Sequence, residues 1–141
     1  MAITLAQANT IIAAALKKGH ELKLKPLSVA VLDPGGHLVA FQREDGASNL
    51  RPQIAAGKAS GALALGVSSR KIGEMAAERP TFIAAVSQIA TGGLVPAAGG
   101  VLVTDKTGTL IGAVGVTGDT SDNDEACSLA GIEAAGLSVK G

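Results

Sequence analysis

Apolar residues recur at helical spacing at the start of the chain. Thr4 and Gln7 form the sequence pattern of a capping box, and Gly19 is a natural stop. Between these signals the apolar positions share one helical face: Leu5, Ala8, Ile12, Ala15 and Leu16. The pattern therefore predicts an amphipathic helix from about residue 5 to about residue 18.

Two pairs of β-branched runs follow, and each pair encloses a turn. The turns are Asp-Pro-Gly-Gly at 33–36 and Asp-Lys-Thr-Gly at 105–108. The predicted strands are 27–32, 37–42, 101–104 and 110–116. Both turns carry the pattern Asp-x-x-Gly-x-Leu, which indicates two similar β-hairpins, each followed by a helix.

Helical patterns with start and stop signals fill the remaining segments. Pro52, Ser68 or Ser69, and Pro80 suit helix starts, and Ser121 with Asp124 has the spacing of a capping box. The predicted helices run over about 52–66, 69–77, 80 to the glycines at 92–93, and 122–136.

This order of elements predicts an α/β (α+β) fold in one domain over residues 1–141. Two hairpins in one small domain most simply pair into a single antiparallel sheet. Because an antiparallel sheet needs only one buried face, we expect the helices to cover one face. The other face carries Ala and Val with few charges, which predicts burial against another subunit and therefore a homo-oligomer.

The composition excludes several classes of function. The 141 residues carry no net formal charge, whereas a nucleic-acid binder needs a basic face. The apolar runs are too short to span a bilayer, so no membrane partner is expected. The N-terminal run lacks a preceding basic residue and contains polar residues, which favours a helix over a signal peptide and predicts a cytoplasmic location. The single cysteine, Cys127, excludes an internal disulfide and is interpreted as a packed side chain.

The two hairpins differ at positions that could carry chemistry. His37 stands where the second hairpin has Thr109, and Arg43 stands where it has Gly115. Because alternate strand residues share a face, we expect His37, Val39, Phe41 and Arg43 to project together. This face would suit an apolar ligand that bears a carboxylate or propionate, or equally an oligomer interface. His37 and Arg43 could also be purely structural, with Arg43 paired to Asp45 or Glu44.

Lys58 lies among small residues of a predicted helix, in the segment Ala-Ala-Gly-Lys-Ala-Ser-Gly. A lysine in such a helix most often faces solvent or joins an ion pair. Beside a pocket it could instead hold an anion or, if desolvated, form a Schiff base. We give the solvent face or an ion pair precedence over catalysis.

The sequence predicts no metal site. The acidic run lacks the glycine of an EF-hand loop, so capping of the last helix is the better interpretation of Asp119, Asp122, Asp124 and Glu125. The two histidines, His20 and His37, cannot form a protein-only zinc site without carboxylates. The glycine-rich stretch 92–100 lacks a Walker pattern but could let backbone groups approach a ligand.

Several stretches together resemble the haem-binding, or haem-degrading, family that includes the GlcG and HbpS proteins and the C-terminal module of PduO corrinoid adenosyltransferases. The matching residues are 29–41, Arg43, Asp45-Gly46-Ala47, Lys58-Ala59, Gly92-Gly93, Pro96, 111–118 and Asp124-Glu125. The resemblance implies a profilin-like fold, oligomers that are often octamers, and haem or corrinoid binding in some members. It marks His37, Arg43 and Lys58 as positions of the family pattern.

The first expected function is a cytoplasmic, homo-oligomeric protein that binds a small molecule, with haem or a related tetrapyrrole as the ligand. His37 or His20 would bind the iron. Phe41, Arg43 and Lys58 would complete the binding site.

Two alternatives remain open from the sequence. One is a small catabolic enzyme of the isomerase, hydratase or lyase type that acts on an organic acid. Arg43 or Lys58 would then bind the carboxylate, and His37 or Asp45 would move the proton. The other is a structural or assembly partner whose polar residues serve an interface.

Overall fold

Five helices and five strands lie within residues 1–140, the part of the chain that this computed structural model describes, in the order α-β-β-α-α-α-β-β-α-β. The helices are α1 (Leu5–Glu21), α2 (Arg51–Leu65), α3 (Ser69–Glu78), α4 (Pro80–Ile89) and α5 (Ser121–Ala134). The strands are β1 (Ser28–Leu32), β2 (Leu38–Arg43), β3 (Gly100–Thr104), β4 (Leu110–Thr117) and β5 (Ser138–Lys140). No helix among the described residues is long and apolar enough to cross a membrane.

The strands form one antiparallel sheet in the order β2-β1-β4-β3-β5. Both predicted hairpins are present, and they join through β1 and β4, where Val31 lies opposite Val114. This confirms the predicted α/β class and the pairing of two hairpins into one sheet. Strand β5 is not predicted from the sequence. This edge strand is three residues long and exposed, so it carries no alternating pattern.

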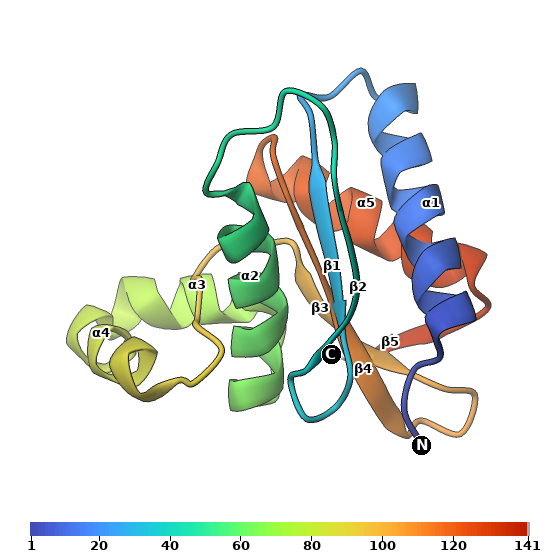
Figure 1. Ribbon diagram of the computed structural model, residues 1–141. Helices are drawn as coiled ribbons and strands as arrows, with labels where there is room; N and C mark the ends of the chain where they lie inside the picture. The colour runs from blue at the N-terminus through green and yellow to red at the C-terminus, as the bar shows by residue number, and fades with distance from the viewer. Residues whose placement is uncertain (141) are drawn as a thin grey trace.

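Helices cover both faces of the sheet, so the expectation that one face lacks helices is wrong. Figure 1 shows α1 and α5 on one face and α2 on the other, with α3 and α4 beyond α2. Every position of β1 and β3 is buried as a result. The apolar second face is therefore explained within the chain, and it is no longer an argument for a second subunit.

The two helical layers pack on the sheet through side chains of different size. Beneath α1 and α5 the core consists of large aliphatic residues, including Ile11, Ile12, Val31 and Val114. Beneath α2 the core includes Ala59, Ala62 and Ala113. These small residues bring α2 so close that a Cβ atom added to Gly115 would lie 1.9 Å from the carbonyl oxygen of Ala55.

The helix ends show where local signals hold and where packing overrides them. The predicted capping box of Thr4 and Gln7 is present. In contrast, Gly19 is buried inside α1, which continues to Glu21 and brings His20 into its last turn. The capping box predicted for α5 is wrong: Thr120 is the N-cap residue, since Asp124 turns inward to a buried partner.

We expect Gly115→Ala to lower the free energy of unfolding by about 2 kcal/mol or more, because the methyl group would overlap the α2 backbone. Gly36→Ala is the control, since Gly36 has open space around it and a φ of 85°. Backbone strain alone should cost about 1 kcal/mol there. Urea unfolding measures both losses, and equal losses would contradict the close approach of α2 to the sheet.

Candidate functional site

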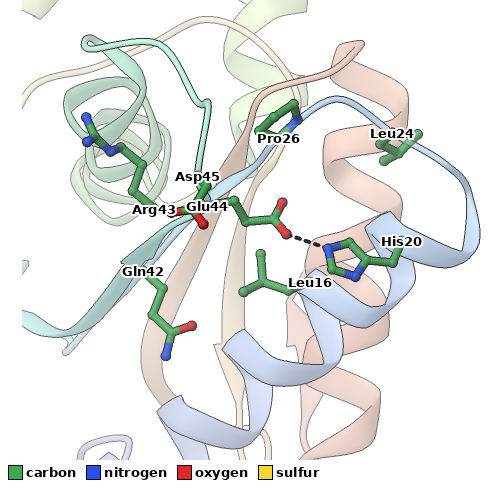
Figure 2. Close-up of a pocket in the computed structure, with 8 residues that line it drawn as sticks. All are labelled: Leu16, His20, Leu24, Pro26, Gln42, Arg43, Glu44 and Asp45. Carbon is green, nitrogen blue, oxygen red and sulfur yellow. Dashed lines mark hydrogen bonds and ion pairs between the residues drawn. The ribbon is translucent and has the colours of Figure 1, made fainter.

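A cavity of about 500 Å³ lies between the end of α1 and the end of β2, and we call it the α1–β2 cavity (Figure 2). Leu16, Leu24 and Pro26 form its apolar wall. Its polar lining comes from His20, Gln42, Arg43, Glu44 and Asp45. The volume of this cavity lies within the range of small-molecule sites, and its lining is polar on one side and apolar on the other.

Glu44 connects the imidazole in this cavity to the sheet. One carboxylate oxygen lies 2.6 Å from Nε2 of His20, and the other accepts the backbone N–H of Leu27 at 2.7 Å. The His20 side chain is 73% exposed, whereas that of Glu44 is only 17% exposed. Glu44 therefore holds a solvent-facing imidazole in one orientation, and Nδ1 of His20 has no hydrogen-bond partner among the described residues.

Arg43 and Asp45 line the same cavity without forming an ion pair with each other. Figure 2 shows the Arg43 guanidinium directed away from His20. The predicted pairing of Arg43 with Glu44 or Asp45 is absent among the described residues, because Glu44 is engaged by His20 and Leu27. Arg43 is thus available to an external carboxylate.

His37 lies at the other end of β2 and lines a separate cavity of about 340 Å³. This second cavity also contains Ser60 and Leu63 of α2 and Gly92 of the glycine-rich loop. Nδ1 of His37 lies 3.2 Å from the Asp33 carboxylate, which also accepts two backbone N–H groups of the turn. Asp33 therefore forms the turn, as predicted, and also orients the exposed ring of His37.

A β-bulge separates residues that the sequence placed on one face. Leu32 pairs with Leu38 and Val31 pairs with Ala40, so Val39 is the extra residue. Val39 packs on the core beneath α1, whereas Phe41 lies opposite Ala30 on the α2 side. The predicted common face of His37, Val39, Phe41 and Arg43 is wrong, since a bulge interrupts the alternation on which it depended.

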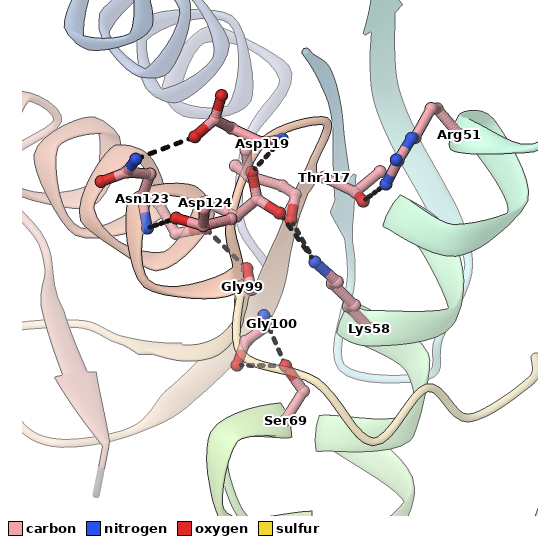
Figure 3. Close-up of polar contacts among 12 residues, drawn as sticks. Arg51, Lys58, Ser69, Gly99, Gly100, Thr117, Asp119, Asn123 and Asp124 are labelled. Carbon is pink, nitrogen blue, oxygen red and sulfur yellow. Dashed lines mark hydrogen bonds and ion pairs between the residues drawn. The ribbon is translucent and has the colours of Figure 1, made fainter. Parts of the chain in front are cut away.

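Lys58 is buried in α2 and forms an ion pair with Asp124 of α5 (Figure 3). Its Nζ lies 3.1 Å from the Asp124 carboxylate and donates to the Val116 carbonyl at 3.1 Å. The second Asp124 oxygen accepts the backbone N–H of Asp119. Of the predicted alternatives for Lys58, the ion pair is confirmed and the solvent face is wrong, because the lysine is 2% exposed.

Burial dominates the electrostatics of this pair. It lowers the pKa of Lys58 and raises the pKa of Asp124, while the charge of each partner opposes the shift of the other. Asp124 carries a structural charge inside the protein, so the predicted capping role does not describe it. Neither group lines any cavity described above, and Lys58 does not reach His37 or Arg43.

The end of the glycine-rich stretch (98–100) and Cys127 both belong to the packed interior, whereas Gly92 at its start is exposed and lines the His37 cavity. A Cβ atom at Gly100 would lie 2.2 Å from the Lys58 carbonyl oxygen, and Ser69 of α3 bonds to the Gly100 backbone. The close backbone approach that glycine permits is therefore made to α2 and α3. Cys127 is fully buried, which raises the pKa of its thiol to about 11 and confirms its interpretation as a packed side chain.

Some residues of these sites had no clear sequence signal. The sequence predicts Glu44 only as a partner for Arg43, and it predicts no apolar wall for the α1–β2 cavity. Leu16 and Leu24 come from different segments, so only the folded chain brings them together. For Lys58, the small residues on all sides of it were a signal that this helix is buried on more than one face.

The fold and the cavities together define a class: a small α/β protein with surface cavities large enough for a ligand. The model of the family described as "Haem degrading protein HbpS-like" matches residues 3–133. The chain therefore belongs to the HbpS-like family of haem-degrading proteins. No curated protein matches the chain.

Solved structures with the same fold agree with this assignment. A PduOC–heme complex superposes with a TM-score of 0.88 at 20% identity, covering 100% of each chain, and at that identity shows the fold alone. The ORFY protein of Klebsiella pneumoniae has a TM-score of 0.84 at 28% identity, covering 95% of this chain and 90% of its own. A double mutant of Streptomyces reticuli HbpS has a TM-score of 0.79 at 29% identity, covering 93% and 85%.

We expect Lys58→Met to lower the free energy of unfolding by about 3 kcal/mol, because it leaves the Asp124 carboxylate buried without its partner. Combining it with Asp124→Leu should restore much of that loss. Lys71→Met is the control, since Lys71 and Glu74 form an exposed pair and should contribute less than about 1 kcal/mol. Urea unfolding compares the variants, and an equal effect of the two lysine substitutions would refute the buried charge.

Asp119 predicts a pH dependence of stability. Hydrogen bonds from the Asn123 side chain, then from Thr120 and Lys25, lower its pKa from 3.8 to about 2. Between these values the unfolded chain binds more protons than the folded protein, so this contribution to stability is present above about pH 4 and disappears toward pH 2. We expect Asp119→Asn to flatten stability over this range in denaturant titrations. If stability depended on pH equally in Asp119→Asn and the wild-type protein, the lowered pKa of Asp119 would be contradicted.

Proposed function

We propose that this protein is a cytoplasmic homo-oligomer that binds haem or a related tetrapyrrole in the α1–β2 cavity. The observation that carries the proposal is an oriented histidine beside an apolar wall, in a chain of the HbpS-like family. The haem-bound PduOC structure, which shares this fold over its whole length, supports the same ligand class.

His20 is the candidate iron ligand. A histidine that binds a metal commonly has its other ring nitrogen hydrogen-bonded to a carboxylate, which fixes the orientation of the ring. Glu44 already holds Nε2 of His20 in this way, and Nδ1 is left for the iron. Haem supplies the iron and its redox chemistry when bound, while Glu44 acts as a positioning residue.

The remaining lining suits the other parts of a tetrapyrrole. Leu16, Leu24 and Pro26 offer apolar contact to the ring. Arg43, the predicted propionate ligand, forms no ion pair within residues 1–140, but its guanidinium is directed away from His20 (Figure 2), so it does not support a propionate contact beside that ring. His37 is the alternative ligand, since Asp33 holds its Nδ1, but its cavity is smaller and lacks a basic side chain.

Exposed apolar side chains support the homo-oligomer. Phe82 and Ile89 of α4 are 40% and 81% exposed, and Leu50 before α2 is 62% exposed. Phe82 and Ile89 are seven residues apart and so share one face of α4, and an exposed apolar helix face is a candidate for contact with another subunit. The buried free thiol of Cys127 is compatible with the cytoplasm, where thiols stay reduced.

Titration with haemin tests the proposal. We expect the wild-type protein to shift the Soret band, and His20→Ala to abolish or strongly change that shift. Glu44→Gln should weaken haemin binding by about tenfold, because the ring loses its charged partner. His37→Ala is the matched control and should leave the spectrum unchanged.

The other outcomes have definite meanings. An unshifted Soret band with wild-type protein would refute haem binding. A shift that survives His20→Ala and is lost in His37→Ala would move the iron ligand to the other end of β2. Sedimentation equilibrium tests the assembly, and a monomer at micromolar concentration would contradict the homo-oligomer.

A further inference from the structure

A third cavity, of about 220 Å³, lies where the loop before α2 meets the end of β4. We call it the loop cavity. Its lining combines two cationic side chains, a hydroxyl and glycine backbone: Lys25, Pro26, Gly46, Ala47, Ser48, Arg51 and Gly118. It contains no carboxylate side chain, in contrast to the α1–β2 cavity.

The two cations of the loop cavity come from separate segments and lack anionic partners. Arg51 donates to the hydroxyl of Thr117 at 2.8 Å, as Figure 3 shows, so its guanidinium is held in place by a neutral group. Neither Lys25 nor Arg51 forms an ion pair within residues 1–140. The Asp119 carboxylate accepts the backbone N–H of Lys25 and the side-chain amide of Asn123, and it forms no ion pair with the Lys25 ammonium.

The positive end of α2 opens toward the same place. Leu50, the N-cap residue, makes no side-chain hydrogen bond to the helix, and Pro52 occupies its first turn. An uncapped helix start carries partial positive charge and attracts anions. The two lining cations add full charges to this partial one.

A buried hydroxyl nearby lacks a partner. Ser28 is 0% exposed, and its Oγ is the one buried side-chain polar atom within residues 1–140 that has no hydrogen bond. In the sheet it lies between Thr117 and Arg43, on the side that faces α2. A buried donor of this kind costs stability unless something accepts from it. Ser28 lies opposite Thr117, whose hydroxyl accepts from Arg51, but it does not itself line the loop cavity.

We infer that the loop cavity binds a small oxyanion, a phosphate or a simple carboxylate. Lys25 and Arg51 supply charge-assisted hydrogen bonds, and the Ser48 hydroxyl and the positive end of α2 add to them. The volume admits an ion of this size but not a tetrapyrrole. Pro26 borders both cavities, but the inference does not depend on haem binding, because Lys25 and Arg51 do not line the α1–β2 cavity.

Thermal unfolding of the haem-free protein tests the site. Inorganic phosphate and acetate are titrated separately, each against sodium chloride at equal ionic strength. We expect at least one of them to raise Tm in a saturable way that chloride does not reproduce. Lys25→Gln and Arg51→Gln should each weaken the apparent affinity by about tenfold, the effect of losing one charge-assisted hydrogen bond.

Lys106→Gln is the matched control, because Lys106 is an exposed lysine in the β3–β4 turn and its loss changes the net charge equally. It should leave the titration unchanged. Equal weakening by Lys25→Gln and Lys106→Gln would reduce the effect to general charge screening and overturn the inference. The inference would also be overturned if neither phosphate nor acetate raised the Tm of the wild-type protein. If Arg51→Gln does not fold, Lys25→Gln decides the question alone.

Discussion

The close approach of α2 to the sheet is the constraint on which the other polar features depend. Glycines at Gly100 and Gly115 leave room for the α2 backbone, and any larger residue would collide with its carbonyl oxygens. This packing places Lys58 in the interior, where only a second charge can accompany it. It also fixes the start of α2 beside the end of β4, which sets the position of Arg51.

The Lys58–Asp124 pair connects layers on opposite sides of the sheet. Lys58 belongs to α2 and Asp124 to α5, and they meet past the end of β4, where Lys58 also bonds to Val116. A buried ion pair contributes little net stability over an apolar pair, but breaking it is costly. Its consequence here is specificity: α2 and α5 are held in one relative position, so the surface cavities around them keep a defined shape.

The two candidate histidine sites lie at opposite ends of strand β2. His37 at its start faces a cavity beside α2, whereas Glu44 just past its end holds His20 of α1. The bulge at Val39 turns the strand between these ends. The first hairpin therefore borders both candidate sites, whereas the second hairpin, which has Thr109 and Gly115 at the equivalent positions, lines neither cavity.

The sequence by itself determined the five helices, the four hairpin strands and the pairing of the two hairpins, but not the edge strand β5. Turn residues such as Asp33 and Gly36, helix caps such as Thr4, and apolar periodicity are local signals, because they report the conformation of neighbouring residues. What covers each face of the sheet, which acid neutralises Lys58 and which residues surround His20 were decided only by the tertiary structure. These contacts join residues distant in the chain, and their energies depend on burial and distance, which no local pattern contains.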